Sequence, residues 1–260
     1  MPDEPDGLVR LRARLAARPA SLGVLRNELS GLLPFQREGV QKLVGYPLCG
    51  RAMLADDMGL GKTVQALQFA AHYGGRLLVL CPAYLQHNWK CEIAHWLSAE
   101  QKADVFSYDR LRHTEIDAQL YSVLLADEAH YIKDHKSARY RNAVQLLHRV
   151  RRVLLLTGTP CPNNPIELWS LLHALRPDAV PSFYAFGRRY CGAKRTRYGW
   201  EARGATRKEE LNYWLTHGFM VRRTKREVLQ DLPAKNVRNL RVQPDTKDLL
   251  RLAQLEEELE

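Results

Sequence analysis

The sequence predicts an α/β fold organised around a mostly parallel sheet. Short, continuous apolar runs alternate with stretches of helical periodicity between residues 50 and 175. This alternation is typical of strands that are buried on both faces by crossover helices. Glycine, acidic or threonine motifs directly follow three of the apolar runs. Because ligands bind at the carboxyl ends of parallel strands, we expect these motifs to form one site.

The elements of this fold follow one another in a regular order. Apolar runs predict strands at 51–55, 76–81, 121–126 and 152–156, with a weaker candidate at 103–107. Helical spacing predicts a helix that begins at Pro34 and further helices at 64–70, 85–97, 136–148 and 166–175. Residues 8–18 form a basic amphipathic stretch, which could be a docked helix or a loose arm.

The character of the chain changes after Pro177, where it becomes basic, aromatic and mostly helical. We expect loops around residues 191–192 and 198–199, an edge strand at 237–242 and a charged helix at 245–260. Residues 185–240 hold 14 Lys and Arg against 5 Asp and Glu, so +9 of the chain's net charge of +10 lies there. A basic, aromatic surface favours nucleic acid as a partner, and an ordinary solvated face is the alternative.

Composition limits the class of protein. The 260 residues are 45% hydrophobic, enough for a sizeable core, and no apolar run is long enough for a transmembrane span. The acidic N-terminus is unlike a signal peptide. Five scattered cysteines without a C-x-x-C pair indicate reduced thiols and an intracellular protein, in the cytoplasm or nucleoid of a bacterium or the nucleus of a eukaryote.

Residues 56–63, here called the glycine loop, join the first predicted strand to the first helix of the alternating region. The sequence is Asp56-Asp57-Met58-Gly59-Leu60-Gly61-Lys62-Thr63. The glycines allow a tight turn that directs backbone N–H groups at an anion. Lys62 can then reach the β- and γ-phosphates of a nucleotide, and Thr63 can hold Mg²⁺. The general phosphate-loop pattern has glycine where this chain has Asp56, so the match is incomplete.

The acidic pair Asp127-Glu128 follows the predicted strand at 121–126. Opposite a phosphate loop, such an Asp completes an Mg²⁺ site with Thr63, and the Glu polarises the attacking water. A polar turn is the alternative, but the glycine loop upstream favours the catalytic interpretation. His130 alone is more often a structural residue, and a part in a relay toward Thr157 and Thr159 would rest on family resemblance.

Four motifs in this order resemble the first RecA-like lobe of the SWI/SNF-type, superfamily-two helicase-like ATPases. They are Pro34-Phe35-Gln36-Arg37-Glu38-Gly39-Val40, the glycine loop with Leu54-Ala55, Asp127-Glu128-Ala129-His130, and Thr157-Gly158-Thr159-Pro160. In that family an Asp at position 56 is usual. Two further stretches, 186–200 and 220–235, resemble the annealing-helicase (HARP-like) branch of fork remodellers.

The resemblance implies ATP and Mg²⁺ as cofactors and a role for each matching position. Gln36 would read the adenine, and the rest of the ATP site would be Asp57, Met58, Gly59, Leu60, Gly61, Lys62 and Thr63. Catalysis would fall to Lys62, Asp127, Glu128 and His130, with Thr63 and Asp127 on the metal. Thr157, Gly158 and Thr159 would couple hydrolysis to DNA. Contacts to nucleic acid are expected from Pro82, Ser107, Tyr108, Arg188, Arg189, Lys194 and Arg195.

The resemblance also implies the organisation of the chain. We expect an N-terminal helical arm at 1–30, an ATP-binding lobe at 31–178, and a basic helical protrusion and linker at 179–260. A second lobe would follow Glu260, and without its arginine finger the chain should hydrolyse ATP very slowly. The leading function is thus the motor lobe of a translocase on double-stranded or branched DNA. A nucleotide-gated, single-lobe binding module is the alternative, and the glycine loop argues against an RNA helicase with a DEAH box.

Overall fold

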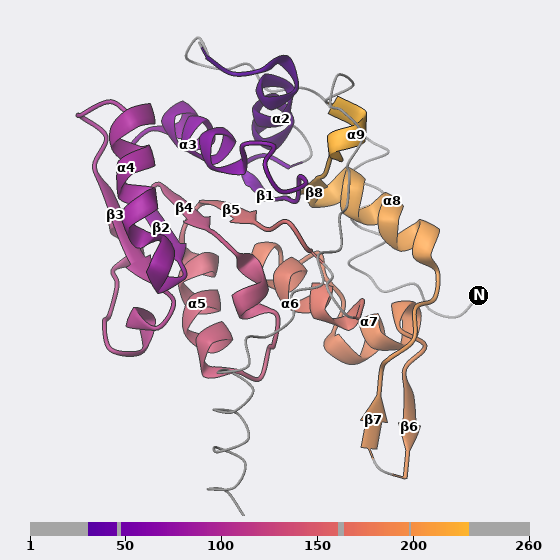
Figure 1. Ribbon diagram of the computed structural model, residues 1–260. Helices are drawn as coiled ribbons and strands as arrows, with labels where there is room; N and C mark the ends of the chain where they lie inside the picture. Colours follow the sequence, from indigo (N-terminus) through magenta and orange to yellow (C-terminus); the bar gives the residue numbers. More distant parts are fainter. Residues whose placement is uncertain (1–30, 46–47, 161–163, 198, 229–260) are drawn as a thin grey trace, which may run out of the picture. The chain divides into compact units, whose positions relative to one another are not determined.

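The computed structural model describes residues 31–45, 48–160, 164–197 and 199–228, all of which belong to one compact unit. The arm expected at 1–30 and the elements expected at 237–260 lie outside the described residues. The predicted α/β class is confirmed, with a parallel sheet between two layers of helices (Figure 1). In the described part of the chain, no helix has both the length and the apolar character needed to cross a membrane.

The main sheet has six strands in the described residues, and every neighbouring pair is parallel. The strand order is β3-β2-β4-β5-β1-β8. The strands are β1 (Arg51–Leu54), β2 (Leu77–Cys81), β3 (Ala103–Ser107), β4 (Val123–Ala126), β5 (Arg152–Leu156) and β8 (Met220–Val221). Leu54 pairs with Leu156 on one side and Val221 on the other, so three strands end at the same level.

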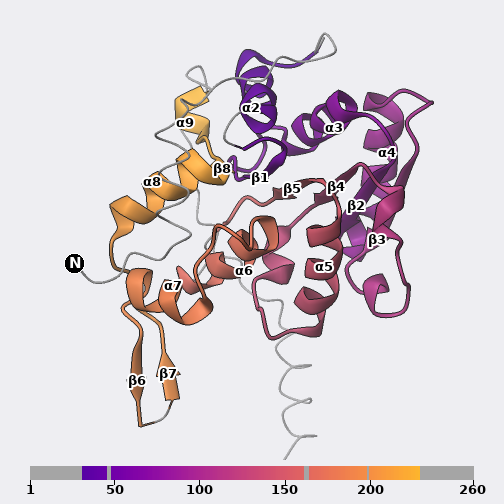
Figure 2. The same cartoon turned by 180° about the vertical axis from the view of Figure 1, so that it is seen from behind.

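Helices cover both faces of the sheet (Figures 1 and 2). One face carries α2 (Pro34–Val44), α3 (Lys62–Tyr73) and α4 (Gln86–Trp96), and the other carries α5 (Ala138–Arg149) and α6 (Ile166–Leu175). Alternate residues of each strand feed two hydrophobic cores. In β1, Leu54 joins the core under α2 to α4, whereas Met53 joins the core under α5 and α6. This two-sided burial explains why the strands are continuous apolar runs.

The segment after Pro177 differs from its prediction in two respects. It contains α7 (Phe183–Tyr190), α8 (Lys208–Gly218) and α9 (Lys225–Val228). Between α7 and α8, where we expected only loops, β6 (Lys194–Thr196) and β7 (Gly199–Glu201) form an antiparallel hairpin. These strands are short and largely exposed, so they carry no alternating apolar pattern. In addition, β8 extends the sheet of the lobe from within the segment that we assigned to the protrusion.

Candidate nucleotide site

Three of the predicted motifs meet at one edge of the sheet. The glycine loop follows β1, Asp127 follows β4 and Thr157 follows β5, and these strands are neighbours in the order β4-β5-β1. A Cβ atom at Gly158 would lie 3.1 Å from Cγ of Met58 and 3.6 Å from Nζ of Lys62. The loop after β5 therefore touches the glycine loop directly.

The glycine loop has the backbone that its two glycines allow. Gly59 has a φ of 83° and Gly61 a φ of 71°, both in the left-handed region. A side chain at Gly61 would also collide with Nε2 of Gln36. Nζ of Lys62 donates hydrogen bonds to the carbonyl oxygens of Asp56 at 2.8 Å and Asp57 at 3.3 Å. The side chain of Lys62 thus folds back onto the glycine loop, where bound phosphates would also lie.

The charge of Lys62 is set by burial and by nearby carboxylates. Burial lowers the pKa of Lys62, and the negative charges of Asp56, Glu128, Asp127 and Asp57 oppose this shift, in that order. Four acidic groups from two separate motifs therefore act on one ammonium. The glycine loop and the acidic pair are therefore close enough at this edge of the sheet for their charges to act on the same ammonium.

Asp127 is held in place by hydrogen bonds to its side chain and its backbone. Its Oδ2 accepts from Nε1 of Trp89 at 2.9 Å, and its Oδ1 accepts from the backbone N–H of Glu128 at 2.9 Å. The buried hydroxyl of Tyr108 donates to the carbonyl of Asp127 at 2.7 Å. Burial raises the pKa of Asp127, and the bond from Trp89 partly offsets the shift. A carboxylate and the hydroxyl of Thr63 are hard oxygen donors that suit Mg²⁺, which takes its remaining ligands from phosphates and water.

Glu128 adopts a strained backbone conformation. Its φ of 48° and ψ of 53° lie in the left-handed region, which costs a residue with a side chain about 1–3 kcal/mol. The carbonyl of Glu128 accepts from the N–H of Tyr131 at 2.9 Å, which helps to hold this turn. Nδ1 of His130 lies 3.1 Å from Oε2 of Glu128, although the two are not aligned as a hydrogen bond. Strain of this kind is typical of residues that are held for function.

Gln36 links the start of α2 to the glycine loop. Its Nε2 donates to the carbonyl of Leu60 at 3.2 Å, and its Oε1 accepts from the N–H of Leu33 at 3.0 Å. The side chain is thus at the edge of the site, where we expected it. Its role in reading adenine stays a prediction, because both ends of the amide are engaged by the chain itself.

Asp56, the residue that departs from the general loop pattern, is the centre of a buried polar cluster. Its side chain is fully buried and forms an ion pair with Arg223, whose Nε donates to Oδ1 at 3.1 Å and whose Nη2 donates to Oδ2. Gln65 donates to Oδ2 of Asp56 at 3.1 Å and accepts from Arg223 at 2.7 Å. Nη1 of Arg223 donates to the carbonyl of Phe35. A carboxylate at position 56 therefore anchors the loop to the segment after β8.

The turn Thr157-Gly158-Thr159, which we expected to couple hydrolysis to DNA, adjoins this site. The side chain of Thr157 is buried, and its Oγ1 accepts a hydrogen bond from the N–H of Thr159 at 3.1 Å. This bond turns the chain sharply after β5. Gly158 lies against Met58 and Lys62, so a shift of either residue would reach this turn.

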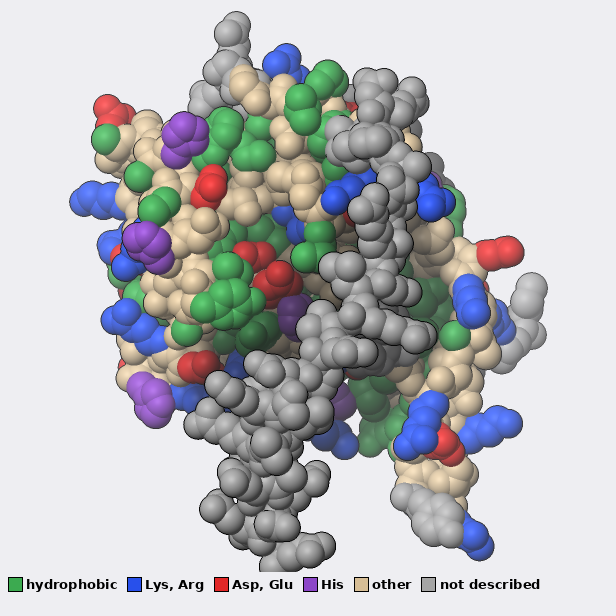
Figure 3. All heavy atoms as spheres, in the orientation of Figure 1, with side chains coloured by type: hydrophobic (Ala, Val, Ile, Leu, Met, Phe, Trp, Pro, Cys, Tyr) green, Lys and Arg blue, Asp and Glu red, His purple; other side chains and the backbone are tan. Residues whose placement is uncertain are grey.

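The residues predicted to contact nucleic acid divide into two groups. Pro82 and Tyr108 are buried, and Arg189 forms a two-pronged ion pair with Glu210 at 2.7 and 3.0 Å, so these three have structural contacts. Ser107 ends β3, where its Oγ accepts from the N–H of Arg110. Three of the predicted basic side chains are exposed, at the end of α7 and on the hairpin: Arg188, Lys194 and Arg195. Figure 3 shows basic side chains at the lower right of the molecule, in the region of this hairpin.

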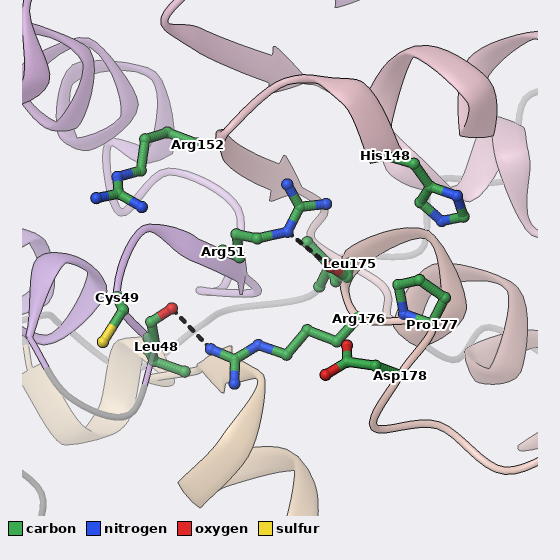
Figure 4. Close-up of a pocket in the computed structure, with 9 residues that line it drawn as sticks. All are labelled: Leu48, Cys49, Arg51, His148, Arg152, Leu175, Arg176, Pro177 and Asp178. Carbon is green, nitrogen blue, oxygen red and sulfur yellow. Dashed lines mark hydrogen bonds between the residues drawn. The ribbon is translucent and has the colours of Figure 1, made fainter. Parts of the chain in front are cut away.

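A separate hollow of about 450 Å³ lies at the amino ends of β1 and β5, and it contains three arginines (Figure 4). Arg51 donates to the carbonyls of Leu175 at 2.8 Å, Val150 at 2.6 Å and Leu147 at 2.9 Å, which close the C-terminal ends of α5 and α6. Nη2 of Arg176 donates to the carbonyl of Leu48 at 2.8 Å. These arginines tie the fold together at the end opposite the nucleotide site.

Several supporting residues were not predicted from the sequence. Trp89 lies within the predicted helix 85–97, where nothing in the sequence marks its N–H as a donor to Asp127. Tyr108 was expected near DNA, yet it supports the turn of Asp127. Arg223 was noted only as part of the stretch 220–235. In a run of basic residues, the sequence does not distinguish the buried arginine from its exposed neighbours. The structure does so, because it shows the ion pair of Arg223 with the distant Asp56.

The fold and the site together define a RecA-like α/β lobe with a candidate nucleotide site at the carboxyl edge of its sheet. The chain matches the SNF2-related domain family over residues 35–120 and 99–250. It belongs to that family, as the sequence motifs predicted.

Relatives place the chain among the proteins that we expected. It is 40% identical over 232 residues to the bovine "SWI/SNF-related matrix-associated actin-dependent regulator of chromatin subfamily A-like protein 1". That alignment covers 81% of this chain and 24% of the bovine protein. It is 36% identical over 235 residues to the human "DNA annealing helicase and endonuclease ZRANB3". That alignment covers 78% of this chain and 22% of the human protein. The chain thus spans about a quarter of the length of these relatives.

A solved structure supports the fold. The "Sulfolobus solfataricus SWI2/SNF2 ATPase core in complex with dsDNA" superposes with a TM-score of 0.62 at 24% sequence identity. The alignment covers 82% of this chain and 49% of that chain. The predicted RecA-like architecture is therefore confirmed.

Proposed function

We propose that this chain is the ATP-binding lobe of a DNA-dependent ATPase that moves on double-stranded or branched DNA. The observation that carries the proposal is that the glycine loop after β1 and the acidic pair after β4 lie at the same edge of the sheet, separated by one strand, β5. A phosphate-binding loop and an Mg²⁺-binding acidic residue are the two halves of an ATP site. The names of the SNF2-family relatives, among them a DNA annealing helicase, support the choice of DNA as partner.

Each group of the site has a task in this proposal. On binding, phosphates replace the carbonyls of Asp56 and Asp57 as partners of Lys62. Bound Mg²⁺ supplies charge neutralisation on the phosphates, and Thr63 and Asp127 would hold it. Glu128 would take a proton from the attacking water, because it directly follows Asp127 in the sequence and its backbone is held in a left-handed turn at the end of β4. The contact of Gly158 with Met58 and Lys62 then carries a change in the site to Thr157 and Thr159.

The DNA contacts fall in part on the exposed basic side chains Arg188, Lys194 and Arg195. Phosphate contacts from such residues give binding that weakens steeply with salt and is independent of base sequence. Hydrolysis needs charge stabilisation from a second lobe. We therefore expect the chain by itself to bind Mg·ATP and to turn it over very slowly.

The experiment that tests this proposal compares wild type with Lys62→Ala. ATP binding should be lost in the variant, while DNA binding at low salt should remain, because the basic residues of the hairpin lie on a different element. Equal ATP affinity in wild type and Lys62→Ala would contradict the proposed site. Rapid DNA-stimulated turnover by the monomeric chain of 260 residues would contradict the need for a second lobe.

A further inference from the structure

The segment after β8 runs directly along the glycine loop. The N–H of Asp57 donates to the carbonyl of Arg223 at 3.0 Å, and the N–H of Lys225 donates to Oδ2 of Asp57 at 3.1 Å. The buried ion pair of Arg223 with Asp56 fixes the same segment from the other side. Two contacts of Arg223 and one of Lys225 therefore hold this segment against the loop.

Lys225 is brought to the glycine loop by these contacts. A Cβ atom at Gly59 would lie 3.3 Å from Nζ and 3.5 Å from Cε of Lys225. The residue is otherwise exposed. A long, flexible side chain with a cationic tip thus reaches Gly59 of the glycine loop.

Bound ATP would bring more negative charge to the site than Lys62 alone can balance, so a second ammonium would stabilise the phosphates. Lys62 faces carboxylates from Asp57, Asp127 and Glu128, and the phosphates of ATP would add several negative charges. An ammonium is a compact point charge that binds phosphate oxygens without demanding one geometry. Because its backbone is already fixed through Asp57, Lys225 would lose only side-chain freedom on binding.

We propose that Lys225 is a second phosphate-binding cation of the nucleotide site, held at the glycine loop by the Arg223–Asp56 ion pair. This inference rests on the proposed ATP site and adds a residue to it. It assigns the segment that leads out of β8 a direct part in nucleotide binding. Nucleotide binding would then depend on the position of residues 223–225, because Lys225 has a phosphate partner only when nucleotide is bound to the glycine loop.

The test measures the Kd of Mg·ATP by isothermal titration calorimetry for the chain and four variants. Lys225→Met keeps the length of the side chain and removes its charge, so Kd should rise about tenfold, the worth of one charge-assisted hydrogen bond. Lys225→Arg retains a cation and should stay within about threefold of wild type. The matched control is Arg226→Met, an exposed neighbour on α9, which should leave Kd within about twofold of wild type.

The outcomes separate this inference from the function on which it rests. If Lys62→Ala abolishes binding but Lys225→Met binds as tightly as Arg226→Met, the inference is wrong and the ATP site stands. A tenfold loss in Lys225→Met that Lys225→Arg does not restore would show that charge is not the cause, and it would also overturn the inference. Failure of the wild-type chain to bind Mg·ATP would overturn both.

Discussion

Replacing Arg223 by methionine tests whether Asp56 is an anchor of the glycine loop. The ion pair is deeply buried, with side-chain exposures of 10% for Arg223 and 0% for Asp56. Removing the arginine leaves the carboxylate of Asp56 in the interior with only Gln65 as a side-chain partner among the described residues. Breaking a buried pair in this way costs about 3–5 kcal/mol, a large share of the roughly 5–15 kcal/mol that stabilises a typical domain.

The assays are urea denaturation for the free energy of unfolding and thermal denaturation for Tm, both monitored by circular dichroism. The free energy of unfolding of Arg223→Met should fall by about 3–5 kcal/mol, and Tm should fall by roughly 10 °C. Arg222→Met is the matched control, because the neighbouring arginine is exposed and its loss should cost less than about 0.5 kcal/mol. A double-mutant cycle with Asp56→Ala should give a coupling of at least about 1 kcal/mol. Equal losses in Arg222→Met and Arg223→Met, or additive effects in the cycle, would refute the reasoning.

Three further predictions concern the site and its surroundings. Glu128→Gln should retain ATP binding but slow single-turnover hydrolysis about 100-fold or more, as expected for loss of a general base; unchanged hydrolysis would remove Glu128 from this role. Because burial raises the pKa of Asp127 above its usual 3.8, Mg²⁺-dependent ATP binding should weaken on acidification at a higher pH than 3.8, as the carboxylate takes up a proton. Asp127→Asn should lack this pH step, and its persistence in that variant would assign the step elsewhere. In iodoacetamide labelling read by mass spectrometry at pH 8, exposed Cys91 should react well before Cys81, because burial raises the pKa of Cys81 to about 12 and leaves little thiolate; equal rates would contradict this burial.

The sequence was a good guide where a structural rule acts over short distances. Strands buried on both faces are continuous apolar runs, so β1, β2, β4 and β5 were predicted nearly to the residue. The weaker strand candidate at 103–107 is also a strand, at the edge of the sheet. The nucleotide site was predicted for the same reason, since each of its motifs directly follows a strand.

The sequence was a poor guide where contacts are distant or elements are short. The pair Asp56–Arg223 joins residues 167 positions apart, and no local pattern reveals it. The strand β8 has two residues, too few for any periodicity, and the exposed strands of the hairpin bury no apolar face. The sequence therefore predicted that these motifs come together at one edge of the sheet, but not the polar cluster that holds the glycine loop.

The most direct test of the central claim is a crystal structure of the chain with Mg²⁺ and a non-hydrolysable ATP analogue. We predict that the phosphates lie against the backbone N–H groups of residues 59–63, with Lys62 turned from the loop carbonyls onto them. Mg²⁺ should lie about 2.1 Å from Oγ1 of Thr63 and on the side of Asp127. Phosphates bound instead among Arg51, Arg152 and Arg176, at the opposite end of the sheet, would contradict the assignment of the nucleotide site.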